Sequence, residues 1–240
     1  MGSIVSSATV CAECDGHGWV ELPAGDGPVR VTRCRCWSNK LATFADGVPH
    51  EFRDARLKNY EPLPGNQAAV RAAKSCLREG RDLLLVGPVG SGKTRLACSV
   101  LNEHFDATRS GRFVRVSSWL DELRLSGDER ADELQARERI SAVPMLVLDD
   151  LGLQTPSQFA NLELAKLCDS RWDRGVRTIW TSNLALSCGK YNPSDPNRPQ
   201  NLGEFLGDDR LPSRLAGRAE VAFLDVPDQR LKGRGRNQRD

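Results

Sequence analysis

One segment of the sequence has the residue types and the spacing of a phosphate-binding loop. Residues 87–94 fit the pattern G-x-x-x-x-G-K-[ST]. Glycines let backbone amides curl around anionic oxygens, and a helix that begins at the loop adds positive potential there. Lys93 is suited to neutralise β- and γ-phosphates, and the Thr94 hydroxyl to bind Mg²⁺. The pattern therefore predicts a nucleoside triphosphate site formed by Gly87, Pro88, Val89, Gly90, Ser91, Gly92, Lys93 and Thr94.

Polar side chains also follow two apolar segments further along the chain. Asp149 and Asp150 come directly after Met145–Leu148, and a buried strand seldom ends in adjacent acids unless they face a cation. We expect Asp149 to hold Mg²⁺ and Asp150 to orient the attacking water. Asn183 follows the segment Thr178–Thr181, and its amide is expected to bind the γ-phosphate or that water. Strands that simply end in polar turns are the alternative interpretation.

Cysteines cluster at the start of the chain. The sequence holds eight cysteines, and the first four can supply the thiolates of a tetrahedral structural zinc site: Cys11, Cys14, Cys34 and Cys36. Trp19–Leu22 and Val29–Thr32 would form a hairpin that brings the two pairs together. Only one residue separates the second pair, so His17 stays an alternative ligand. Two disulfides or four free thiols are the competing interpretations.

Composition places limits on the class of protein. The chain has 240 residues, of which 39% are hydrophobic and 28% charged, so it can form the core of one domain plus a small appendage. A net charge of +2 is too small for nucleic acid to be the default partner on charge alone. No apolar run approaches the roughly 18 residues of a membrane span, and the first residues lack the features of a secretory signal. We therefore expect a cytoplasmic protein without a membrane partner.

The phosphate-binding motif lies within an alternation of apolar and helical segments. The apolar segments are expected as strands at 83–86, 113–117, 145–148, 178–181 and 221–224. Helical periodicity falls at 67–77, 95–105, 157–174 and from Trp119 onward, with Gly80 as a stop signal. Continuous apolar strands separated by helices predict an α/β fold with a parallel sheet covered on both faces.

The same reading divides the chain into parts. Residues 1–45 have few large aliphatic side chains, so this zinc-binding domain would need its metal to fold. A proline-containing linker is expected over 46–66, the ATPase domain over 67–230 and a basic, disordered tail over 231–240. The residues between 187 and 203 are rich in proline, asparagine and glycine, which is typical of a surface loop.

Several motifs in this order resemble those of the AAA+ ATPases. Within that superfamily the sequence is similar to the bacterial and phage helicase loaders of the DnaC/DnaI type, whose sister group is the IstB transposition helpers. Residues 87–94, 146–152 and 181–184 resemble the Walker A, Walker B and sensor-1 motifs. Residues 209–215 resemble the arginine-finger segment, and residues 228–230 the terminal arginine that senses nucleotide.

The resemblance implies a P-loop ATPase with a five-stranded parallel sheet between helices, which uses ATP and Mg²⁺. It implies that Arg214 acts on ATP held by a neighbouring subunit and that Arg230 contacts nucleotide. Copies would assemble as a spiral or ring in the ATP state. The implied partners are a replicative DnaB-type helicase, gripped by the zinc arm with its Zn²⁺, and single-stranded DNA.

Other interpretations stay open at this stage. Many relatives carry Glu where this sequence has Asp150, and the shorter side chain could slow hydrolysis. A transposition helper that binds double-stranded DNA and a nucleotide-controlled adaptor with negligible turnover are the alternative functions. Arg171 is a second interface candidate, although a salt bridge on a helix surface explains it equally well. Arg112, Arg115 and Arg124 with Trp119 could form a surface that binds phosphates and stacks bases, and a core Trp is the alternative.

Overall fold

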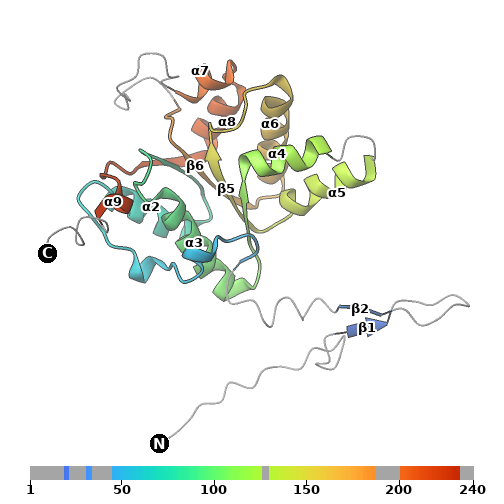
Figure 1. Ribbon diagram of the computed structural model, residues 1–240, viewed down its shortest axis with the longest axis horizontal. Coiled ribbons are helices and arrows are strands. Elements are labelled where there is room, and N and C mark those ends of the chain that lie inside the picture. The colour runs from blue at the N-terminus through green and yellow to red at the C-terminus, as the bar shows by residue number, and fades with distance from the viewer. Residues whose placement is uncertain (1–18, 22–30, 34–44, 126–129, 187–200, 233–240) are drawn as a thin grey trace, which may run out of the picture. The chain divides into compact units, whose positions relative to one another are not determined.

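The computed structural model describes residues 19–21, 31–33, 45–125, 130–186 and 201–232 (Figure 1). The chain divides into two compact units between residues 43 and 44, and each is considered by itself. In the first unit β1 (Trp19–Glu21) pairs antiparallel with β2 (Val31–Arg33). Two strands of the predicted hairpin are therefore present. The connecting turn and the four clustered cysteines lie outside the described residues.

The second unit is built on a five-stranded sheet in which every neighbouring pair is parallel. The strand order is β4-β5-β6-β3-β7, which confirms the predicted five-stranded parallel sheet. The strands are β3 (Asp82–Val86), β4 (Arg112–Arg115), β5 (Met145–Leu151), β6 (Arg177–Ser182) and β7 (Ala219–Phe223). Because the strands are parallel, the carboxyl ends of β5, β6 and β3 meet at one edge of the sheet.

Helices cover both faces of this sheet (Figure 1). One face is covered by α2 (Gln67–Glu79) and α3 (Lys93–Thr108). The helices of the other face are α4 (Val116–Leu125), α5 (Arg130–Ser141), α6 (Gln158–Asp173), α7 (Leu202–Leu206) and α8 (Arg210–Arg218). Alternate strand residues point to the two faces, and the second face buries Leu84, Leu148 and Trp180 with the helices above them.

Helix ends follow local sequence signals. Gly80 ends α2 in the left-handed conformation that glycine adopts without strain, as the sequence predicts. The Ser157 hydroxyl accepts a hydrogen bond from the Ala160 N–H and thereby caps α6. The short α9 (Gln229–Lys232) ends the described chain.

Two predicted boundaries near the site were wrong. The strand expected over 145–148 extends to Leu151 and includes both acids. The strand expected over 113–117 ends at Arg115, and α4 begins at Val116 rather than at Trp119. Val116, Trp119 and Leu123 recur at helical spacing and are all buried, so the helical period extends further back than the sequence reading placed it. Trp119 is only 2% exposed and is a core side chain, which rules out the base-stacking role considered for it.

Residues 46–66, which the sequence predicts to be a linker, pack onto α3. This segment contains the short 3₁₀ helices η1 (His50–Phe52) and η2 (Leu57–Asn59). The Asn102 side chain of α3 donates hydrogen bonds to the carbonyls of Phe52 and Ala55, at 2.9 and 3.1 Å. Leu57 is buried. Glu51 and Phe52 of η1 line the same cavity as the nucleotide loop.

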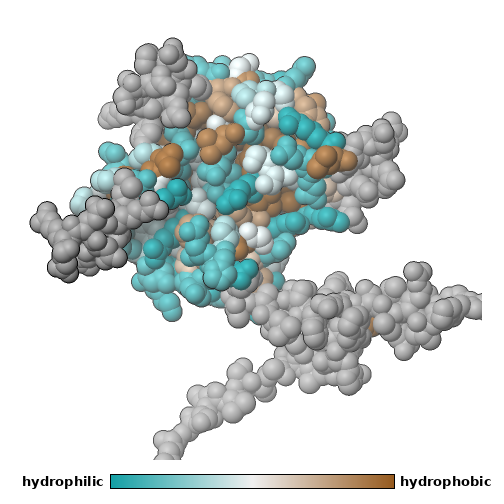
Figure 2. All heavy atoms as spheres, viewed as in Figure 1, coloured by the Kyte–Doolittle hydropathy of each residue, from teal (hydrophilic) through white to brown (hydrophobic). Residues whose placement is uncertain are grey.

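The outer surface of the described body is mixed in character. Figure 2 shows hydrophobic side chains interspersed with hydrophilic ones on the face in view. Across the part of the chain that the structure describes, no helix combines the length and the apolar character needed to cross a membrane.

Candidate nucleotide site

The predicted phosphate loop lies between the end of β3 and the start of α3. Gly90 and Gly92 have φ angles of 75° and 93°, a backbone region that favours glycine. This conformation turns the loop sharply, so that α3 can begin at Lys93. The sequence pattern therefore has a local structural reason as well as a chemical one.

The loop borders a cavity of about 360 Å³. Segments that are far apart in the sequence contribute to its lining, which consists of Glu51, Phe52, Val89, Gly90, Gly92, Lys93, Thr94, Arg95, Asp150, Leu153, Asn183, Gln229 and Arg230. The fold therefore brings together residues predicted separately from the loop, the acidic pair, the segment that follows residues 178–181 and the C-terminal motif.

Lys93 lies inside the curve of the loop and is 6% exposed. Its ammonium donates hydrogen bonds to the carbonyls of Gly87 and Pro88, at 2.8 and 2.7 Å. Burial lowers the pKa of Lys93 from 10.5 to about 8, while the nearby acids Asp150 and Asp149 act in the opposite direction. A buried cation held by neutral carbonyls gains from an anionic ligand, as a triphosphate would provide.

Asp149 contacts Thr94 and is 2% exposed. Its Oδ1 accepts hydrogen bonds from the hydroxyls of Thr94, at 2.9 Å, and Thr181, at 2.6 Å. Burial raises the pKa of this carboxyl, and the Thr181 hydrogen bond opposes that shift. Hydroxyl and carboxylate oxygens are the ligands that Mg²⁺ prefers, so Thr94 and Asp149 fit the ion that accompanies ATP.

A bulge in β5 explains how adjacent acids serve the same site. Leu148 pairs with Trp180 and Leu151 pairs with Ser182. Between these pairs β5 advances by three positions and β6 by two, so the pairing register shifts at the acids. Asp150 has a φ of 62°, an uncommon conformation for a residue other than glycine. Side chains of a regular strand alternate between faces, whereas here Asp149 reaches Thr94 and Asp150 lines the cavity.

Thr181 was missed as a functional residue by the sequence reading. Its hydroxyl donates to Asp149 and accepts a 2.9 Å hydrogen bond from the Asp150 N–H, so one side chain contacts both acids. The sequence signal was a threonine at the end of an apolar segment, where it is the first residue of the motif 181–184 that contains Asn183. Its importance follows from the pairing of β5 with β6.

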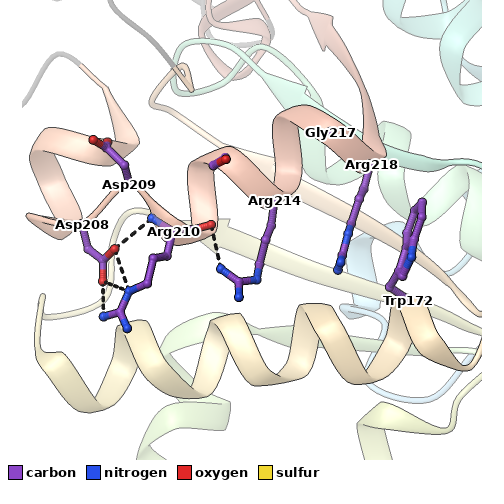
Figure 3. A pocket seen from close by; sticks show the side chains of 8 residues that line it. Trp172, Asp208, Asp209, Arg210, Arg214, Gly217 and Arg218 are labelled. Atoms are coloured by element: carbon purple, nitrogen blue, oxygen red, sulfur yellow. Dashed lines mark hydrogen bonds and ion pairs between the residues drawn. The ribbon is translucent and has the colours of Figure 1, made fainter.

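Arg214 does not line the nucleotide cavity of its own chain. It lies on α8, where its Nε donates to Oδ1 of Asp169 on α6 at 2.9 Å. Arg218 donates to the same oxygen at 2.9 Å and stacks over Trp172 (Figure 3). The hydrogen bond from Arg214 holds the pKa of Asp169 below its ordinary value. Trp172, Arg214 and Arg218 border a separate, open groove of about 630 Å³.

Arg171 is not a surface residue, and this corrects both sequence interpretations of it. It is 1% exposed, and burial lowers its pKa to about 10. Its guanidinium donates to the carbonyls of Ile140 and Val143, at 2.6 and 2.9 Å, and to the Thr178 hydroxyl at 2.8 Å. Arg171 therefore joins α6 to the residues that precede β5 and to β6 itself.

Zinc ligation stays a prediction. Among the described residues, no three or more His, Cys, Asp or Glu side chains gather as a metal site would require. Cys76, Cys98 and Cys168 are buried free thiols. The N-terminal cysteines lie outside the described residues.

Comparisons with known proteins agree with this geometry. The family described as IstB-like ATP binding protein matches residues 38–195, more than half of the chain. An insertion-sequence protein of Pseudomonas fluorescens (IS1162), named for ATP binding, is 31% identical over 132 residues, which cover 55% of this chain and 56% of that protein. The replicative helicase loader DnaC of Buchnera aphidicola subsp. Schizaphis graminum is 24% identical over 145 residues, covering 58% and 59% of the two chains.

The fold likeness extends to solved structures. The crystal structure of a DnaC helicase loader superposes with a TM-score of 0.60 at 23% identity, covering 73% of this chain and 99% of that chain. The second unit therefore has the α/β P-loop fold of the AAA+ ATPases. The chain spans just over half the length of the curated relatives it matches.

Proposed function

Because the chain belongs to the IstB-like ATP-binding protein family, we propose that it is a Mg²⁺-dependent ATPase whose nucleotide state controls its assembly on DNA. The observation that carries this proposal is the 2.9 Å contact between Thr94 and Asp149, beside the buried cation of Lys93. Two hard oxygen ligands and one cation at a glycine-rich loop are what a magnesium-bound triphosphate requires.

In this proposal each residue has a separate task. Lys93 neutralises the phosphates, and Thr94 with Asp149 holds Mg²⁺, which supplies charge stabilisation at phosphate oxygens. Asp150 orients the attacking water. Asn183 donates its amide to that water or to the γ-phosphate.

Arg214 is proposed to act on ATP bound by a neighbouring copy, because the nucleotide cavity of its own chain lies elsewhere in the fold. The Asp169 carboxylate binds the Nε edge of its guanidinium, which leaves a terminal nitrogen for an anionic partner. The assembled form would be a ring or spiral in which each site is completed by the next subunit.

For the partner, we propose a replicative DnaB-type helicase that is delivered onto single-stranded DNA, with the N-terminal cysteine-rich segment as a zinc-bound arm that binds it. The likeness to DnaC loaders supports this role. A transposition helper that binds double-stranded DNA is the second candidate, and the higher identity to an insertion-sequence protein favours it.

The ATPase is tested by nucleotide binding and phosphate release. Lys93→Ala should abolish ATP binding and nucleotide-dependent assembly. Lys74→Ala, an exposed lysine of α2, is the matched control and should change neither. Assembly that persists unchanged in Lys93→Ala would refute the nucleotide switch, and tight ATP binding without phosphate release would favour an adaptor.

Co-elution and DNA binding distinguish the two candidate functions. The purified protein is mixed with the host replicative helicase, with and without ATP, and its binding to single- and double-stranded DNA is compared. Helicase binding together with single-strand preference supports the loader. Filaments on long duplex DNA without helicase binding support the transposition helper, and repeating the assay with a Cys14→Ala variant tests the arm.

A further inference from the structure

The chain that follows β7 is held along the nucleotide loop by backbone hydrogen bonds. The Leu224 N–H donates to the Val86 carbonyl of β3 at 2.7 Å. The Gln229 N–H donates to the carbonyl of Gly90 in the phosphate loop at 2.9 Å. The end of the described chain is therefore fixed to the same strand and loop that form the nucleotide site.

The Asp228 side chain joins this segment to the loop. A Cβ atom added to Gly90 would overlap the Asp228 carboxylate, so the carboxylate lies directly against the glycine. The same carboxylate, through Oδ1, accepts the Arg230 N–H at 2.8 Å. One side chain thus contacts the loop and fixes the backbone of the arginine two residues later.

The Arg230 side chain lies at the nucleotide cavity and, among the described residues, is held in place only through its backbone. Its side chain is exposed and lines the cavity, and its charge is close enough to lower the pKa of Lys93. Its guanidinium makes no hydrogen bond or ion pair with the residues that the structure describes. A long side chain without partners loses conformational entropy when it binds a ligand. A backbone that already holds the side chain near the ligand reduces this cost of binding.

We propose that Asp228 is a positioning residue for nucleotide binding. It holds residues 228–230 on the phosphate loop, so that the Arg230 guanidinium faces the anionic oxygens of the bound triphosphate. This inference rests on the proposed ATP binding. The effect comes from the hydrogen bond and not from the negative charge, since a carboxylate beside the loop repels phosphate.

The structure offers a matched control. Asp208 accepts the Arg210 N–H through Oδ1 at 2.8 Å, the same bond over the same two-residue spacing. Asp208 borders the groove beside α8 and does not line the nucleotide cavity. Asp208→Ala therefore removes the same backbone bond elsewhere in the fold, together with the ion pair between Asp208 and the Arg210 side chain.

The experiment measures the Kd of the full-length chain for ATP at protein concentrations that keep it monomeric. Asp228→Ala and Arg230→Ala should each weaken binding about 10-fold, the loss expected for one hydrogen bond to a charged group. The double variant should bind no more weakly than Arg230→Ala alone, because Asp228 acts through Arg230. Asp228→Asn keeps an acceptor oxygen and removes the repelling charge, so it should bind ATP at least as tightly as the wild type, while Asp208→Ala should leave the wild-type Kd unchanged.

The outcomes distinguish this inference from the function on which it rests. If the wild-type chain does not bind ATP, the proposed function fails. If the wild type binds and Asp228→Ala stays within about twofold of it, the inference is overturned, as it is if the losses of the two single variants multiply in the double variant. A loss in Asp228→Asn equal to that in Asp228→Ala would also overturn it, because the acceptor would then be irrelevant.

Discussion

Replacing Thr181 by valine tests how the two acids of β5 are held. Valine has nearly the same shape as threonine but neither donates to Asp149 nor accepts from the Asp150 N–H, bonds of 2.6 and 2.9 Å in this structure. A hydrogen bond to a charged group contributes about 1.5–3 kcal/mol, and an amide left without a partner costs at least about 1 kcal/mol. We expect Thr181→Val to lower the free energy of unfolding by about 3 kcal/mol in urea denaturation.

The same change should weaken Mg²⁺ binding. Burial already raises the pKa of Asp149, and the Thr181 hydrogen bond is the main influence against that shift. Without it the carboxylate is less well oriented and takes up a proton more readily. Loss of a residue that orients a metal ligand costs about 10–100-fold in metal affinity. The assay is a Mg²⁺ titration of ATP binding, and the Mg²⁺ concentration at half-saturation should rise by that factor.

Thr178→Val is the matched control on the same strand. Thr178 is also buried and accepts a 2.8 Å hydrogen bond from a charged partner, Arg171. Thr178 lies near the start of β6, whereas Thr181 contacts the acids near the end of the strand. Its loss should destabilise the fold to a similar extent while leaving the Mg²⁺ requirement unchanged. Equal Mg²⁺ titrations for wild type, Thr181→Val and Thr178→Val would refute the assignment of Thr181 to the metal site.

Two other predictions concern buried charges. Because burial lowers the pKa of Lys93 to about 8, a bound triphosphate should raise it again, so ATP binding should take up a proton between about pH 8 and 10 and none well below pH 8. Calorimetry in buffers of different ionisation enthalpy measures this uptake, and its absence at pH 9 would contradict the assignment. Arg171→Ala should lower the free energy of unfolding by about 4 kcal/mol, because several carbonyls lose their buried donor. Arg174→Ala removes an exposed ion pair with Glu138 and should change stability by less than about 1 kcal/mol, so equal losses in the two variants would argue against the buried network.

The sequence by itself determined the features that depend on neighbouring residues. The glycine-rich loop, the apolar strands and the stop signal at Gly80 are local patterns, and the structure places the sheet and the end of α2 accordingly. These features are readable because backbone conformation and helix capping depend on residues a few positions apart. The boundary at Val116 was misread since a short apolar run fits both a strand and a helix.

The motifs predicted that the loop, the acids and Asn183 act together, whereas only the tertiary structure decided how they meet and which further residues join them. The register shift that turns Asp149 and Asp150 to one site depends on how β5 pairs with β6, and Thr181 gains its role from the same pairing. Asp228 meets Gly90 because β7 lies beside β3 in the sheet, although the two residues are far apart in the sequence. Strand order and packing depend on how much apolar surface the whole chain buries. The residue types at these individual positions therefore do not indicate which strands will pair.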